Sequence, residues 1–261
     1  MKRILLISLV LFLACEGEMG CESNPPFSGT IFIDKDIITS ADSSTFEVVI
    51  YSGIGQREMF DRRVNDWTTI NAYLFNASFN DGLICEIQVN PEFGSPDDAL
   101  TEAIKYGEVI GRLPTVLRKD VETVWIHKGI KPFGGGNNNL LIHTGQAADY
   151  INEGILEETF VHEAAHTSLD SSHAFSNGWI SAQNSDCNFI SNYAKEYPQR
   201  EDIAESFLPW LAVKYRSDQM SKGLIDTILQ TIPNRIEYFD NQSFDMYPVN
   251  ITSVLNDTVY H

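Results

Sequence analysis

The chain has 261 residues, of which 43% are hydrophobic and 11% aromatic. This composition excludes a disordered protein, and the length allows a core that is stable without disulfides or metals. Lys and Arg number 18 against 36 Asp and Glu, which gives a formal net charge of -18. A surface this acidic repels phosphate backbones, so nucleic acid is not an expected partner.

The chain begins with the pattern of an export signal. A basic start precedes an apolar run, Ile4 to Ala14, which is too short to span a bilayer as a mature helix. The run ends at Cys15, and this junction resembles a bacterial lipobox, although Phe12 stands where that motif usually has Leu. The resemblance implies an exported protein tethered to a membrane through a lipidated Cys15. The alternative is an ordinary secretory signal, cut between Ala14 and Gly20.

Alternation, helical spacing and turn residues predict the elements that follow. Strands are expected at residues 30–33, 45–51, 84–89, 121–127 and 140–143. Helices are expected at 59–79, 97–111, 113–118, 154–166, 186–197, 201–215 and 219–231, and strand or loop after them. The end of the first of these could instead extend into a strand. No repeat or Pro- and Ser-rich linker divides the chain after residue 29. We therefore expect a signal peptide at 1–14, a tether at 15–29 and a single domain at 30–261.

One expected helix carries the string His162-Glu163-Ala164-Ala165-His166. Residues four apart share a helical face, so His162 and His166 can bind one Zn²⁺. Glu163 lies one step round the helix, where it can take a proton from a water at the open position of the metal. The spacing therefore predicts a hydrolytic zinc site.

A catalytic zinc needs a third protein ligand, and three downstream residues are candidates. His173 follows His166 by seven residues, whereas metzincins place a third His six residues on, after a turn with Gly, where this chain has Leu169. Glu201 and Glu205 lie one helical turn apart, so either could be the ligand and the other a supporting residue. The residues alone leave this choice open.

The order of elements resembles the zincin metallopeptidases, and the segment Glu201-Asp-Ile-Ala-Glu205-Ser resembles the gluzincins, lethal-factor-type peptidases especially. The resemblance covers roughly residues 155–210. It implies an α+β fold in which a mixed sheet packs on the HExxH helix, followed by a mainly helical C-terminal part. It also implies Glu201 as the third zinc ligand and Tyr193 as a hydrogen-bond donor to the oxyanion.

Zincins also use the edge strand of the sheet to bind extended substrate. Carried over by resemblance, that role falls to residues 140–143 or to the Gly-rich segment 133–139 before them. The alternative for the Gly-rich segment is a plain hairpin loop, since Gly and Asn permit positive φ.

Together these features predict a zinc-dependent metallopeptidase that acts on peptide or protein substrates. Glu163 is the expected general base, and Asp170 could accept the N–H of a ligating His. The alternative from another class is a non-catalytic exported surface protein with a zincin-like fold and a structural metal or none. Such a protein has no need of Glu163.

Overall fold

The computed structural model describes residues 24–249, except residue 35. The expected signal peptide, Cys15 and most of the expected tether lie outside these residues, as does the end of the chain after residue 249. Within the described part, no helix is both long and apolar enough to cross a membrane.

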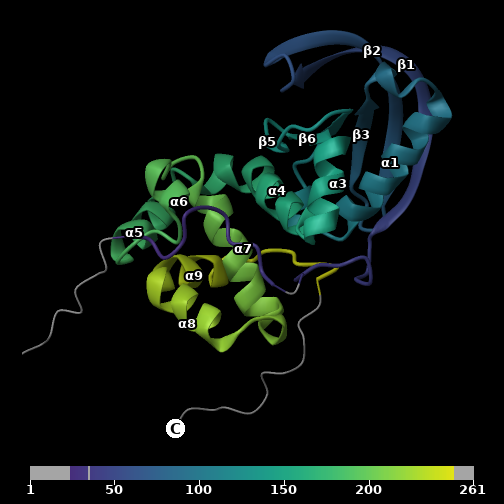
Figure 1. The fold of residues 1–261 in the computed structure, drawn as a ribbon. Helices are drawn as coiled ribbons and strands as arrows, with labels where there is room; N and C mark the ends of the chain where they lie inside the picture. Colours follow the sequence, from purple (N-terminus) through teal and green to yellow (C-terminus); the bar gives the residue numbers. More distant parts are fainter. Residues whose placement is uncertain (1–23, 35, 250–261) are drawn as a thin grey trace, which may run out of the picture.

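The fold is α+β and contains a mixed six-stranded sheet in the order β1-β2-β3-β4-β6-β5 (Figure 1). The strands are β1 (Phe46–Asp61), β2 (Asp66–Phe79), β3 (Ile84–Val89), β4 (Thr123–His127), β5 (Gly134–Gly136) and β6 (Asn139–His143). β1, β2 and β3 are antiparallel, β3, β4 and β6 are parallel, and β5 is antiparallel to β6. Since β6 lies between β4 and β5, residues 140–143 are internal. The Gly-rich β5 is the edge strand.

The helix expected at 59–79 is wrong, because these residues form the end of β1, a turn and β2. The two strands pair down to Asp61 and Asp66, and the turn is closed by Asn65 at a φ of 56°. The helical spacing of the apolar residues is a coincidence, because these residues lie on two paired strands. Across the pair, Met59 packs with Ala72 and Leu74 in a small cluster. The hairpin arches over the sheet toward β5 (Figure 1).

The helices of the described residues are α1 (Pro96–Gly111), α2 (Thr115–Arg118), α3 (Thr144–Glu153), α4 (Leu156–His173), α5 (Asn177–Ser185), α6 (Asn192–Glu196), α7 (Asp202–Tyr215), α8 (Lys222–Thr231) and α9 (Pro233–Asp240), with short 3-10 turns η1 (Pro91–Phe93) and η2 (Ser217–Gln219). α3, α5 and α9 were not predicted from the sequence. The helix expected at 186–197 is shorter, because Ser191 caps α6 by accepting the N–H of Ala194.

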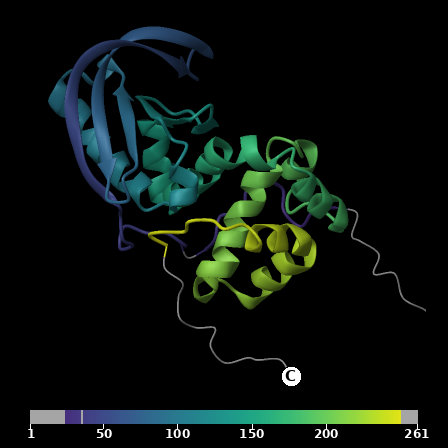
Figure 2. The ribbon, with the colours of Figure 1, turned by 180° about the vertical axis from the view of Figure 1, so that it is seen from behind.

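Helix α4 lies between the sheet and the C-terminal helices (Figure 2). It is buried on almost every side, and it packs on β5 and β6 as well as on α7. Gly154 ends α3 at a φ of 73°, which turns the chain into α4. Because α4 is packed on both sides, the positions of His162, Glu163 and His166 are fixed.

The strand expected at 30–33 is absent, and the segment is held by a buried carboxylate instead. Glu158 of α4 accepts the backbone N–H of Ile33 at 2.9 Å and of Ile37 at 3.3 Å. Burial raises the pKa of Glu158 to about 7, although these two hydrogen bonds oppose the rise. The N–H groups of Ile33 and Ile37 are therefore satisfied by a side chain of α4 rather than by a neighbouring strand.

Candidate metal centre

Helix α4 carries His162, Glu163 and His166 beneath the edge strand β5. Gly136 donates its N–H to Thr167 Oγ1 at 2.9 Å, and this hydroxyl donates to the Asn139 carbonyl at 2.8 Å. At Gly135, an added Cβ would collide with the carbonyl oxygen of Glu163. Only glycine therefore allows β5 to approach the helix this closely.

The two imidazoles converge with Glu201 on one point. His162 Nε2 and His166 Nε2 lie 3.2 Å apart, and Glu201 Oε2 lies 3.2 Å from the second and 3.7 Å from the first. Two ligands about 2.0–2.1 Å from a tetrahedral metal lie about 3.4 Å apart, which these three separations match. The group is buried, and it could hold a metal ion.

Glu201 directly precedes α7 and is fixed by neighbours on the same stretch of chain. Its Oε1 accepts the Tyr193 hydroxyl at 2.9 Å and lies 3.0 Å from Arg200 Nε, while its Oε2 faces the histidines. One oxygen is therefore held by the protein and the other is directed to the candidate metal position. Tyr193 therefore lies beside Glu201, the residue that the resemblance names as the third ligand.

The charges of the cluster suit a cation. Burial would raise the pKa of Glu201, but hydrogen bonds with His162 and His166 hold it well below its usual range. Burial would likewise lower the pKa of His166, but hydrogen bonds to Asp170 and Glu201 raise it to about 10. Both shifts express the same fact: the carboxylates around these imidazoles favour positive charge between them.

Asp170 and Glu205 lie behind the imidazoles. Asp170 Oδ2 is 2.9 Å from His166 Nδ1, and Glu205 Oε1 is 3.6 Å from His162 Nδ1. Glu205 also accepts hydroxyls from Thr30 and Ser191, each at 2.5 Å. Both carboxylates therefore face the Nδ1 side of a ring, where they would orient it while Nε2 binds a metal.

His173 lies apart from the cluster of His162, His166 and Glu201. It is at the end of α4, where its Nδ1 is 2.6 Å from the hydroxyl of Tyr238. Among the candidates for a third ligand, the structure thus brings Glu201 to the two Nε2 atoms, puts Glu205 behind His162 and directs His173 elsewhere.

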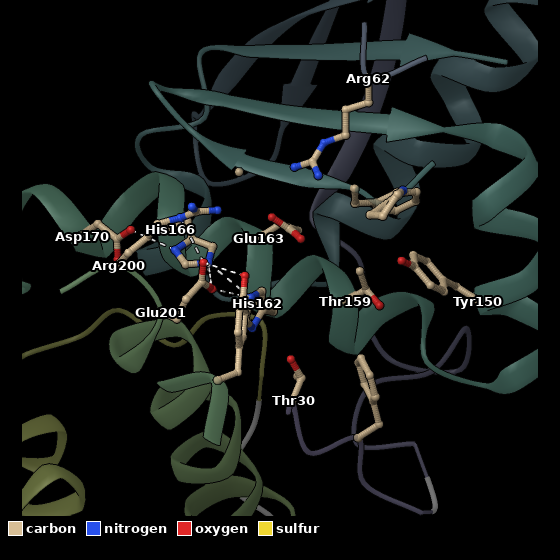
Figure 3. Close-up of a pocket in the computed structure, with 15 residues that line it drawn as sticks. Thr30, Arg62, Tyr150, Thr159, His162, Glu163, His166, Asp170, Arg200 and Glu201 are labelled. Carbon is tan, nitrogen blue, oxygen red and sulfur yellow. Dashed lines mark hydrogen bonds and ion pairs between the residues drawn. The ribbon is translucent and has the colours of Figure 1, made fainter. Parts of the chain in front are cut away.

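The cluster opens into a cavity of about 410 Å³ (Figure 3). Glu163 lines this cavity beside the histidines, as do Tyr193 and Asp170. The other lining residues are Thr30, Phe32, Arg62, Pro132, Phe133, Gly135, Tyr150, Thr159 and Arg200. The metal position is therefore accessible to a small group on the side where Glu163 lies.

Several lining residues were not predicted from the sequence: Thr30, Phe32, Arg62, Pro132, Tyr150, Thr159 and Arg200. Thr30 and Phe32 come from the N-terminal segment, Arg62 from the β1–β2 turn and Tyr150 from α3, all outside the HExxH helix. No local pattern marks them, because their position depends on the packing of these segments around α4 and β5.

No protein-family model, curated protein or solved structure matches this chain.

Proposed function

We propose that the protein is a zinc metallopeptidase with a zincin-like domain. The observation that supports this most is the convergence of two imidazole Nε2 atoms and one carboxylate oxygen at 3.2, 3.2 and 3.7 Å, at the edge of an open cavity. Two His and one carboxylate are a ligand set of catalytic zinc, which keeps a further position for water or substrate. When bound, the metal would supply Lewis acidity toward a water molecule and the substrate carbonyl.

Glu163 and Tyr193 have complementary roles in this proposal. Glu163 takes a proton from the attacking water and gives it to the departing amine, which makes it both general base and general acid. Tyr193 donates its hydroxyl to the carbonyl oxygen as negative charge develops there. To do so, the hydroxyl must exchange its present acceptor, Glu201 Oε1, for the substrate.

The edge strand β5 provides the place for a peptide. It pairs with β6 on one side only and lies directly on α4, next to Glu163. An extended substrate that adds to this edge would run along the metal position with its backbone held by main-chain hydrogen bonds. This supports a peptide or protein substrate rather than a small amide. We also propose that the enzyme is exported.

The test combines metal analysis with proteolysis assays of the wild-type chain and Glu163→Gln. Both proteins should bind one zinc per chain, since Glu163 is not among the converging ligands. The variant should lose about 10²- to 10⁴-fold in kcat, the usual contribution of a general base. Full activity of the zinc-bound variant would contradict the mechanism, and a zinc-bound wild type that cleaves no peptide would contradict the function.

A further inference from the structure

Arg62 is unusual among the arginines of this chain. Seven others in the described residues have a carboxylate within ion-pair distance: Arg57, Arg63, Arg112, Arg118, Arg200, Arg216 and Arg235. Within the same part of the chain, Arg62 has none, although acidic residues outnumber basic ones two to one. The charge of this guanidinium is therefore available to an acidic ligand.

The fold directs Arg62 into the cavity by anchoring its neighbour. Arg63, the next residue, pairs with Asp61 and Glu92, each at 2.7 Å. Arg62 instead lines the cavity, and its Nη2 lies against Gly134 of β5. Figure 3 shows its guanidinium above Glu163, and Tyr150 and Thr159 also line the cavity.

The role proposed for Glu163 indicates which part of a bound substrate lies near Arg62. Arg62 and Glu163 line the same cavity, and Figure 3 shows the guanidinium closer to Glu163 than to the two histidines. A general acid that protonates the departing amine must lie close to that nitrogen. The substrate residue that carries the amine, the one after the cleaved bond, therefore lies on the Arg62 side.

We propose that Arg62 is a specificity residue that binds a carboxylate on the substrate, on the C-terminal side of the cleaved bond. Guanidinium and carboxylate form a two-point hydrogen-bonded pair, which fixes orientation as well as charge. The carboxylate has two sources: an Asp or Glu side chain, or the free C-terminus of a short peptide. Asp170 and Glu201 line the same cavity and repel acidic groups that lie near them, so the preference for a carboxylate is local to Arg62.

This inference depends on the proposed peptidase function, and its test starts from the zinc-loaded full chain. A peptide library first identifies cleaved sequences. Matched substrates are then made with Glu or Gln after the cleaved bond, each as free acid and as C-terminal amide. Wild type, Arg62→Gln and Arg62→Lys are compared by kcat/KM. Arg57→Gln is the control, because Arg57 is on the same hairpin but pairs with Glu86 outside the cavity.

Arg62→Gln should lower kcat/KM by about 10- to 100-fold for substrates with the carboxylate and by less than about threefold for their neutral partners. Arg62→Lys should recover part of the loss. If the Glu/Gln pair shows the difference, the site takes an acidic side chain; if the acid/amide pair shows it, the site takes a C-terminus. An equal loss on every substrate, or no loss, overturns the proposal.

A binding measurement separates this proposal from the peptidase function. If the wild type cleaves no library peptide, the peptidase function fails, and fluorescence anisotropy with labelled acidic peptides and their amide counterparts tests Arg62 alone. Tighter binding of the carboxylate peptides by wild type, abolished in Arg62→Gln and kept in Arg57→Gln, supports the proposal. Equal binding of acidic and neutral peptides by the wild type overturns it.

Discussion

The described residues include two pairs of buried histidines, and the two pairs differ in ring geometry and in surroundings. His162 and His166 are four residues apart on α4, and their Nε2 atoms meet beside carboxylates. His127 and His143 are register partners on the parallel strands β4 and β6, and their rings stack at 26° with centroids 5.4 Å apart. Helical spacing makes ring edges converge, whereas strand register makes ring faces stack.

The surroundings of the two pairs decide their charge. Asp170 and Glu201 raise the pKa of His166 to about 10 despite its burial. Burial lowers the pKa of His127 to about 4, and the nearby Asp61 only partly opposes this. Only the first pair therefore favours a cation between its rings. Burial of two histidines is not enough for a metal site; carboxylates must also converge on them.

The largest expected effect is the loss of metal from the first pair. Zinc sites bind with about 10–16 kcal/mol over four ligands, so removing one ligand costs about 3 kcal/mol, or more than 100-fold in affinity. His166→Ala should show this loss in isothermal titration with Zn²⁺. His143→Gln is the matched control, since it removes a buried imidazole of the second pair. An equal loss in both variants would contradict the assignment.

The next effect is a change with pH in the free energy of unfolding, caused by His127 of the second pair. The pKa of His127 is about 4 in the folded protein and about 6.5 when unfolded, so the unfolded state binds more protons between these values. Stability from this group is therefore complete above pH 6.5 and is lost as the pH falls toward 4. From pH 7 to pH 4.5 this amounts to about 2–3 kcal/mol.

Urea unfolding of wild type and His127→Gln at pH 7 and 4.5 measures this effect. The variant keeps a side-chain acceptor for the Asn90 amide, which lies 3.0 Å from His127 Nδ1. Its free energy of unfolding should fall less with decreasing pH than that of the wild type. Parallel pH profiles would mean that His127 does not titrate in this range.

A smaller effect is expected when a carboxylate behind the first pair is neutralised. Asp170 Oδ2 lies 2.9 Å from His166 Nδ1, and carboxylates of this kind affect metal affinity by about 10- to 100-fold. Asp170→Asn should lower zinc affinity by that factor in a competition assay with a chelator. The bound stoichiometry should remain one per chain at saturating zinc, and a lost site would instead make Asp170 a ligand.

How much of this comparison could be predicted from the sequence depends on how far apart the interacting residues lie along the chain. The convergence of His162 and His166 follows from helical periodicity within five residues. The position of Glu201 came from a resemblance to known peptidases, since no physical rule relates a helix to a residue 35 positions later. The structure brings Glu201 to the imidazoles through the packing of α4 against α7.

The failures share the same cause. Residues 59–79 satisfy helical spacing locally, but pairing between β1 and β2 decides their structure. Arg62 has no local signal at all, because its significance depends on Gly134 and on the anchoring of Arg63 by Glu92. The stacked pair was also unpredictable, since His127 and His143 meet only through strand register.

The smallest expected effect is at Glu205. It tests whether a carboxylate that lies farther from its imidazole contributes less to zinc affinity. Glu205 Oε1 is 3.6 Å from His162 Nδ1, compared with 2.9 Å for Asp170 and His166, and it already accepts hydroxyls from Thr30 and Ser191. A contact this long is not a hydrogen bond, so it orients the ring weakly. Glu205→Gln should therefore lower zinc affinity by less than about tenfold, below the range for a closely bonded carboxylate. A loss as large as that of Asp170→Asn would show that Glu205 moves onto His162 when the metal binds.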